Sequence, residues 1–588
     1  MMSDDKEDGE KLFSEKGTSQ PPEAAKFIPD TETKNGVSPI NVECIKSKFT
    51  GLTKEELLKY SKDPFWIRIR WTLFILFWII WFIMLFGAIA VIIVTPKCKQ
   101  ADPPLWWQRS ALYKTEVLTL PQKDGLVIDS LRRHIDHLKE LGVETLVLKY
   151  VLNADLSTPL DVTNFTDVMP VLKSLDDFKT KIIDYAKEKD INVIIEFIPN
   201  SSSKNHVLFI RATSNETDFE DVYVWYPKNK EQNTSNWKSV YGGSAWSKEN
   251  NRYFLHQFLA NEPEFNFRNS RTLQLFNDTF LTWLNLGVKG FFLDRTEYLL
   301  EDANFEDEKV ARNTSFTADQ YGYYYHSNTF ERPETTELLK NWSSIIKNQS
   351  GILGVSGGVR DDREIANFVF RPIFLPPNFN ATQLNDDITR WKSSVDQPAW
   401  EWNCTKDVKQ CFPEEAIDGL RIVSFLLPGT PVLKLGQEFG YDNVFHPNNN
   451  TINQELWQQV QANQSANPES HLNIVKELIK LREKPSITYG TFESTVLKNT
   501  NNSSSTVFAF TRIKSGNPGY LVAWNLGNES AVVNFDQFTT VPDDLIVVIK
   551  SGRVFGNQYP NKSRIFSSNV ELPPKAAAVF SFVPKSQN

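Results

Sequence analysis

Hydrophobic and polar positions divide the chain into four successive patterns. The first 45 residues are acidic and polar with no hydrophobic period, which is typical of disorder. An unbroken apolar run follows at 71–95. Amphipathic segments then alternate with short apolar segments from 113 to 488, and short segments of strand character occupy 489–588. The pattern predicts a polar tail at 1–70, a membrane span, a short stalk at 96–112 and two folded domains.

The apolar run is long enough to cross a membrane as a helix. It reads "WTLFILFWIIWFIMLFGAIAVIIVT", 25 residues without a charge, and a hydrocarbon core of about 30 Å needs about 20 residues. A cleaved signal peptide is the rival interpretation. Seventy mostly polar residues precede the run, however, and its apolar part is too long for a signal peptide. We therefore predict one transmembrane helix at 71–95.

Glycosylation acceptors indicate the orientation of this span. Asn-x-Ser/Thr occurs sixteen times after the run and never before it, and basic residues just before the run slightly outnumber those just after it. Asn200, at a predicted strand end, is set aside, and Asn502 overlaps the acceptor at Asn501. The candidate acceptors are Asn164, Asn215, Asn233, Asn277, Asn313, Asn341, Asn348, Asn380, Asn403, Asn449, Asn463, Asn501, Asn528 and Asn561. The distribution predicts a type II protein with a cytosolic N-terminus.

The four cysteines fit an oxidising compartment for the large C-terminal part. Cys404 and Cys411 lie close enough in the chain to form a local disulfide. Cys98 stands in the stalk with no obvious internal partner, which indicates an intermolecular disulfide. A free thiol and a homodimer link are the alternatives for Cys98.

Repeated helix–strand units predict a parallel sheet covered by helices. Helical stripes such as "DSLRRHIDHLKELGV" and "LDDFKTKIIDYAKEKD" precede apolar strands such as "ETLVLKY" and "INVIIEFIP". A (β/α)8 barrel over 113–488 fits their number, with an irregular aromatic insertion at 201–268. The strands "STVFAFTRI", "GYLVAWNL", "LIVVIK" and "AAAVFSFV" predict an antiparallel β-sandwich at 489–588.

Several motifs in this region resemble the α-amylase superfamily, glycoside hydrolase family 13, close to its maltase branch. They are "LPGTPVLKLGQEFG", "YGGSAWS", "YFLHQF", "NFRN" and "VIIEFIPN", and the resemblance covers about residues 105–585. It implies a barrel interrupted by a B domain and followed by a β-sandwich. It also implies an ancestral active site that cleaved α-glucosides by a retaining mechanism, with a nucleophilic carboxylate and an acid about 5 Å away.

The resemblance implies that most of this catalytic machinery is missing. Asp294 in "GFFLD" occupies the nucleophile's place, but Phe292 replaces the arginine beside it. Ser356 in "ILGVSGGV" stands at the place of the acid with no glutamate near it in the sequence, and a serine cannot supply that proton. Thr405 replaces the stabilising aspartate. Glu364 is considered as a displaced acid and rejected, because it would not restore the other two groups. We therefore expect Asp294 to be a remnant that caps the strand or pairs with Arg295.

The same comparison implies lost sugar contacts around the site. Ser201 and Cys404 stand where the family has histidines, and Leu160 stands where it has a stacking tyrosine. Asn403 and Asp161 are retained.

No other chemistry is indicated by the sequence. We expect His134 and His137, on a predicted amphipathic helix, to be solvated and not metal ligands. The sequence shows no phosphate-binding glycine loop and no zinc-spaced cysteines, so we expect no metal and no cofactor. The net charge of −8 argues against nucleic acid as a partner.

The stalk "PKCKQ" and the following "PPLWWQRSALYK" resemble the heavy subunits of heteromeric amino-acid transporters, solute carrier family 3. This resemblance implies a disulfide through Cys98 to a polytopic light chain, which the heavy chain stabilises and delivers to the plasma membrane. Two alternatives remain: a membrane-tethered α-glucosidase, and a glycosylated adhesion or toxin receptor.

Overall fold

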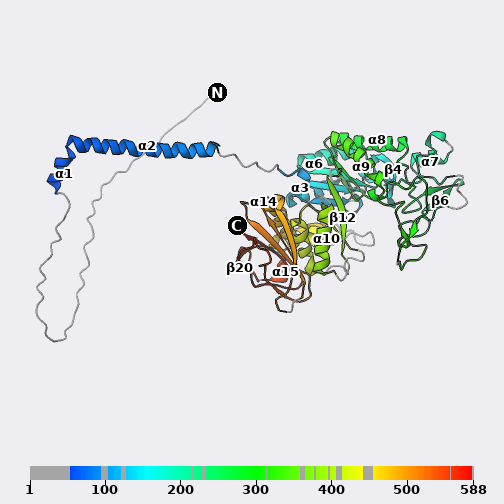
Figure 1. The fold of residues 1–588 in the computed structure, drawn as a ribbon. Helices are drawn as coiled ribbons and strands as arrows, with labels where there is room; N and C mark the ends of the chain where they lie inside the picture. The colour runs from blue at the N-terminus through cyan, green and yellow to red at the C-terminus, as the bar shows by residue number, and fades with distance from the viewer. Residues whose placement is uncertain are drawn as a thin grey trace, which may run out of the picture. The chain divides into compact units, whose positions relative to one another are not determined.

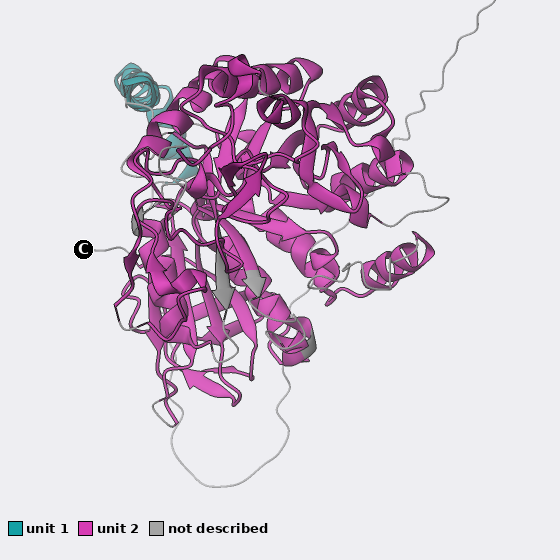
Figure 2. Ribbon diagram, turned by 90° about the vertical axis from the view of Figure 1, so that its right-hand side faces the viewer, with its two compact units in different colours: residues 1–100 teal, residues 101–588 magenta. Residues whose placement is uncertain are grey.

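The computed structural model falls into two compact units, 1–100 and 101–588 (Figure 2). Each unit is described by itself. The residues that the structure describes are 53–94, 103–120, 127–214, 216–227, 234–312, 314–357, 365–375, 379–394, 398–404, 413–440, 454–501, 504–556 and 558–585.

The first unit contains two helices, α1 (Lys54–Ser61) and α2 (Pro64–Val94). A capping box starts α1, because the Thr53 hydroxyl accepts from the backbone of Glu56 while the Glu56 carboxylate accepts from the backbone of Thr53. Pro64 opens α2, where a missing N–H costs nothing. Within the described residues, α2 is the one helix long and apolar enough to span a membrane, and it starts seven residues before the uncharged run.

The second unit is built on a closed parallel barrel, as the helix–strand alternation predicts (Figure 1). The order around the barrel is β1, β14, β13, β12, β11, β8, β5, β2. In chain order the strands are β1 (Leu112–Glu116), β2 (Thr145–Lys149), β5 (Asn192–Phe197), β8 (Gly290–Leu293), β11 (Ile352–Val355), β12 (Phe368–Leu375), β13 (Pro398–Cys404) and β14 (Thr430–Lys434).

Helices precede and follow these strands along the chain. They are α3 (Trp106–Arg109), α4 (Val127–Leu141), α5 (Leu175–Phe178), the π-helical turn η3 (Lys179–Ile183), α6 (Asp184–Glu188), α8 (Ser270–Leu286), α9 (Pro333–Asn348), α10 (Ala381–Ser394), α11 (Ile417–Leu426), α12 (Gln454–Ala466), α13 (His471–Arg482) and α14 (Pro485–Tyr489). Helix α8 buries one apolar face, which includes Phe276, Phe280 and Trp283. Asn269 caps the start of α8, and Gly287, with φ of 112°, ends it.

Insertions project where strands end. The hairpin of β3 (Leu152–Asp155) and β4 (Thr158–Val168) follows β2. Between β5 and α8 lie α7 (Val207–Thr213), β6 (Trp246–Glu249) and β7 (Arg252–Leu255), in the region predicted as the insertion. The hairpin of β6 and β7 and the segment before it form a small aromatic core that includes Tyr226, Trp237 and Trp246. A second excursion after β8 carries β9 (Lys309–Val310) and β10 (Tyr324–Tyr325).

The C-terminal strands form an antiparallel sheet of six, with a two-stranded sheet of β18 and β21 sharing its core. The strands are β15 (Thr491–Leu497), β16 (Val507–Ile513), β17 (Gly519–Asn525), β18 (Ala531–Val533), β19 (Asp544–Lys550), β20 (Arg564–Phe566), β21 (Val570–Leu572) and β22 (Ala577–Phe582), with α15 (Gly552–Phe555) after β19. Buried Arg512 of β16 joins this part to the barrel region, because it donates to the carbonyl of Leu426. Buried Arg482 of α13 donates to the carbonyls of Phe425 and Gly429 within the barrel region.

Candidate functional site

Asp294 lies at the carboxyl end of β8, where a barrel enzyme carries its catalytic groups. Its backbone N–H donates to the Phe197 carbonyl at 3.0 Å, and its Oδ1 accepts from the Arg295 N–H at 2.9 Å. The Arg295 guanidinium pairs with Glu262 at 3.4 Å and lies 3.7 Å above the Phe258 ring. Asp294 therefore caps the turn after its strand, while the Arg295 side chain is held by Glu262.

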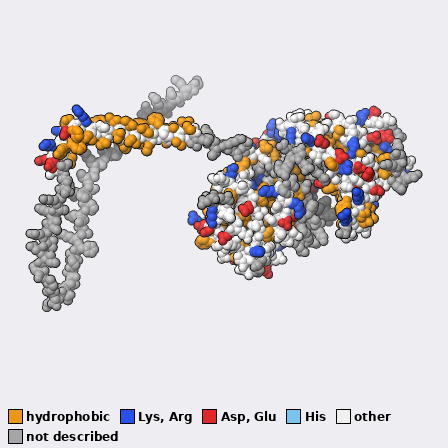
Figure 3. All heavy atoms as spheres, in the orientation of Figure 1, with side chains coloured by type: hydrophobic (Ala, Val, Ile, Leu, Met, Phe, Trp, Pro, Cys, Tyr) orange, Lys and Arg blue, Asp and Glu red, His pale blue; other side chains and the backbone are white. Residues whose placement is uncertain are grey.

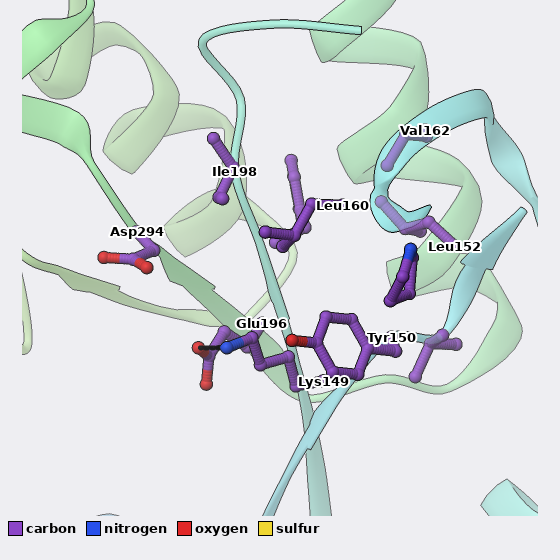
Figure 4. A pocket seen from close by; sticks show the side chains of 11 residues that line it. Lys149, Tyr150, Leu152, Leu160, Val162, Glu196, Ile198 and Asp294 are labelled. Atoms are coloured by element: carbon purple, nitrogen blue, oxygen red, sulfur yellow. Dashed lines mark ion pairs between the residues drawn. The ribbon is translucent and has the colours of Figure 1, made fainter. Parts of the chain in front are cut away.

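A small cavity lies beside Asp294. Its volume is about 20 Å³, which accommodates roughly one water molecule, whereas small-molecule pockets are typically at least about 300 Å³. In Figure 4, Leu160 lies above the Tyr150 ring, Ile198 stands at the upper left, and Asp294 and Glu196 lie on the left. Apolar and aromatic side chains thus line the cavity next to the position of the nucleophile.

Phe292 fills the interior of the barrel at the level of Glu196, its neighbour in register on β5. The Phe292 ring is 3.9 Å from the Phe370 ring, centroid to centroid, and is 2 % exposed. The Lys114 Nζ lies 4.7 Å from its centroid, a favourable cation–π position. A ring therefore stands where the resemblance implies an arginine, and the cation of this layer comes from β1.

A buried ion-pair network crosses the barrel below Asp294. Lys114 Nζ lies 3.0 Å from a Glu196 oxygen and 3.1 Å from a Glu401 oxygen, so it joins β1 to β5 and β13. Lys434 pairs with the other Glu401 oxygen at 2.9 Å. Lys149 lies 4.0 Å from Glu196 (Figure 4). Charges within the network compensate one another, which a low-dielectric interior requires.

The pKa values of the network follow from burial and these pairings. Burial alone would raise the pKa of Glu401, but the Lys114 and Lys434 charges lower it to about 2. Burial likewise lowers the pKa of Lys114, and the Glu196 and Glu401 charges reverse this, so that its pKa lies above the ordinary value. Burial raises the pKa of Glu196, an effect that Lys114 partly offsets. Lys114 and Glu401 therefore form the strongly charged centre of the barrel.

Ser356 directly follows β11, and its hydroxyl is hydrogen-bonded within the protein. Its hydroxyl donates to Glu297 Oε2 at 2.6 Å and accepts from the Thr296 N–H at 3.0 Å. Burial raises the pKa of Glu297; the hydrogen bond from Ser356 lowers it, and the Asp294 charge adds to the rise. The sequence places no glutamate near Ser356, yet the fold brings one from the turn after β8. The only sequence signal for it is the spacing of three residues from Asp294.

The other predicted site residues have mixed positions. Leu160 lines the small cavity, and Asp161 is buried on β4, where burial raises its pKa. Ser201 is buried, and its backbone forms an isolated antiparallel β-bridge with that of Glu264. Outside the described residues lie Cys98, Glu364, Thr405, Cys411 and the side chains of Asn403 and Cys404.

The expectation that His134 and His137 are solvated is wrong. They are 5 % and 6 % exposed, because this face of α4 packs against the barrel. His134 Nε2 hydrogen-bonds Thr115 at 3.0 Å, and His137 Nε2 hydrogen-bonds Glu438 at 2.9 Å. Among the described residues, no group of three or more His, Cys, Asp or Glu side chains is arranged to hold a metal ion.

The predicted glycosylation acceptors differ in exposure. Asn277, on α8, is half-buried with its carbonyl oxygen enclosed, and Asn200 is 1 % exposed. Outside the described residues are Asn215, Asn233, Asn313 and Asn449. The exposed acceptors are Asn164, Asn341, Asn348, Asn380, Asn463, Asn501, Asn528 and Asn561.

Known proteins match both parts of the chain. The α-amylase catalytic domain model matches residues 127–371, and the model for the solute carrier family 3 member 2 N-terminus matches 38–113. The chain is 26 % identical to maltase A2 of Drosophila melanogaster, covering 61 % of this chain and 70 % of the maltase. It is 25 % identical to the human amino acid transporter heavy chain SLC3A1, covering 68 % of this chain and 63 % of that protein.

Solved structures agree on the fold. The α-glucosyl transfer enzyme XgtA superposes with a TM-score of 0.67 at 19 % identity, and the isomaltulose synthase from Klebsiella with 0.66 at 19 % identity. Each match covers 82 % of this chain and all of the other. The second unit is therefore of the α-amylase type. The N-terminal match at 38–113 is to a solute carrier family 3 model, so the chain is similar to that family in its N-terminal part and to the α-amylases in its barrel.

The charge network predicts a specific loss of stability in Glu401→Gln. The substitution leaves Lys114 and Lys434 without their shared carboxylate, so at pH 7 unfolding should require about 3 kcal/mol less free energy. The difference should persist down to about pH 4.5, the ordinary glutamate value, and shrink as the pH falls towards about 2, where the native carboxyl protonates. Urea unfolding between pH 3 and pH 7 measures it. Glu477→Gln, at an exposed pair on α13, should change stability by less than about 0.5 kcal/mol; an equal effect in both variants would contradict the network's role.

Restoring the arginine beside Asp294 should harm the protein without restoring chemistry. In Phe292→Arg a second cation would enter the packed layer beside Lys114, and we expect a loss of at least about 3 kcal/mol with no α-glucoside hydrolysis. Thermal unfolding and a chromogenic α-glucoside assay measure the two effects. Phe566→Arg, at a side chain 70 % exposed on β20, is the matched control and should unfold like the wild type. A stable, hydrolysing Phe292→Arg protein would refute this reading of the layer.

Proposed function

We propose that this chain is the heavy subunit of a heteromeric amino-acid transporter and has no glycosidase activity. The observation that carries the proposal is the combination of the one helix among the described residues that could span a membrane with an α-amylase-type unit whose cavity beside Asp294 measures about 20 Å³. A single helix cannot enclose an alternating-access site, so transport requires a polytopic partner.

Loss of catalysis is supported by the groups around Asp294. Retaining hydrolysis needs a second carboxyl acting as acid, with room for the sugar between the two carboxyls. Ser356 stands at the acid's position, and Glu297 is engaged in accepting the Ser356 hydroxyl hydrogen bond. Removing the acid from such a mechanism costs several powers of ten in rate. The maltase relatives support the barrel, but the substitutions around Asp294 favour a protein that does not hydrolyse glucosides.

The heavy-subunit role includes a disulfide from Cys98 to the light chain. Cys98 follows the uncharged run by three residues, which puts its thiol near the membrane surface and within reach of an outer loop of the partner. Exposed acceptors such as Asn341 and Asn528 support a glycosylated, extracellular second unit. The topology is accordingly type II at the plasma membrane. Cys404 and Cys411 form a local disulfide.

The disulfide is tested by gel mobility in native membranes. We expect a band that falls by the mass of one light chain on reduction when the chain is co-expressed with a candidate light chain. Cys98→Ser should show only the reduced mobility without reductant, because the linking thiol is gone. Cys44→Ser, on the predicted cytosolic side, is the matched control and should keep the linked band. A band unmoved by reductant with every candidate light chain would contradict the heavy-subunit role, and a shift to twice this chain's mass would indicate a homodimer.

A further inference from the structure

The break between α1 and α2 is built into the sequence. Thr53 and Glu56 fix the start of α1 through the capping box. The chain leaves the helix after Lys62, and the Asp63 carboxylate accepts from the Phe65 N–H at 3.0 Å, which caps α2 before Pro64. The two helices are thus separate elements with a defined corner, and Figure 1 shows α1 running across the axis of α2.

The length of α2 places this corner at the level of the lipid headgroups. Its 31 residues extend about 46 Å, whereas the hydrocarbon core is about 30 Å thick. The excess belongs at the N-terminal end, since Arg68 and Arg70 are charged and residues 71–94 are not. When α2 crosses the bilayer, the first turns of α2 therefore stand among the headgroups. A helix that runs crosswise from that end lies along the membrane surface.

The side chains of α1 suit this position. Leu57 and Leu58 are 56 % and 53 % exposed, and Tyr60 is 44 % exposed, so none of the described residues buries them. Acidic side chains are outnumbered, since residues 53–70 contain five Lys and Arg against three Asp and Glu. Figure 3 shows the apolar covering of α2 ending near charged side chains at this end of the first unit. The basic residues in the described part of the first unit, 53–94, are Lys54, Lys59, Lys62, Arg68 and Arg70.

We propose that residues 53–70 form a surface anchor that binds anionic phospholipid. Leu57 and Leu58 enter the boundary between headgroups and acyl chains, while the lysines of α1 and the two arginines of α2 contact the lipid phosphates and carboxylates. Each basic side chain near an anionic leaflet strengthens such binding by roughly fivefold, and the apolar residues fix the helix in the interface plane. The anchor rests on the membrane span of the proposed function and is independent of the light chain.

The test is amide hydrogen exchange of residues 54–61 in the full-length chain, reconstituted alone in lipid nanodiscs. We expect exchange to be at least about tenfold slower in discs of phosphatidylcholine with one-fifth phosphatidylserine than in phosphatidylcholine alone, and the difference to vanish in 0.5 M NaCl, where charges are screened. Both leaflets have one composition, so the result does not depend on topology.

Matched variants separate the lipid contact from helix stability. The triple substitution Lys54→Gln, Lys59→Gln and Lys62→Gln should exchange equally fast in both kinds of disc. The same change of charge in the tail, Lys6→Gln, Lys11→Gln and Lys16→Gln, should leave the lipid effect intact. Equal exchange of the wild type in both discs would overturn the proposal. Protection that appears only after a light chain is added would also overturn it, because α1 would then dock on protein, and the heavy-subunit role would stand.

Discussion

The interior of the barrel depends on one buried interaction, the pairing of the Lys114 ammonium with the carboxylates of Glu196 and Glu401. It joins three strands that are far apart in the sequence, and it lies against the Phe292 and Phe370 rings. Removing one member of such a buried set leaves an uncompensated charge, which costs far more than the intact set contributes. The charged groups, the two phenylalanine rings and the strands that carry them therefore stabilise one another as one buried layer.

On the proposal that the chain has no glycosidase activity, this buried layer accounts for how the fold persists without that activity. An active site needs carboxyls that change protonation state during the reaction and a space that admits substrate. Here Glu196 and Glu401 are paired with lysines, Ser356 donates to Glu297, and the cavity beside Asp294 holds roughly one water. The former catalytic end thus contributes to stability. Under the proposed function, the outside of the unit and the membrane helix carry the role, which fits the match of residues 38–113 to a solute carrier family 3 model.

Sequence patterns predicted the elements well and the site only partly. The barrel and the C-terminal sheet follow from periodicity, since the alternating stripes and apolar strands have few other ways to be buried. The ion-pair network could not be predicted in this way, because Lys114 and Glu401 are 287 positions apart and meet only when the barrel closes. Glu297 was missed for the same reason. The prediction that His134 and His137 are solvated was wrong because a helical period shows only which residues share a face. It does not show that Thr115 and Glu438 lie where they hydrogen-bond the two buried imidazoles.

The most direct test of the account is covalent trapping at Asp294. The full-length chain would be incubated with an activated fluoroglucosyl fluoride, which leaves a long-lived glycosyl ester on the nucleophile of a retaining α-glucosidase, and its intact mass would be compared with that of a maltase treated in parallel. The account predicts no gain in mass for this chain while the maltase is labelled. A gain of one fluoroglucosyl group that maps to Asp294, and is absent in Asp294→Asn, would contradict it, because it would mean that the site admits a sugar and that the carboxylate still reacts.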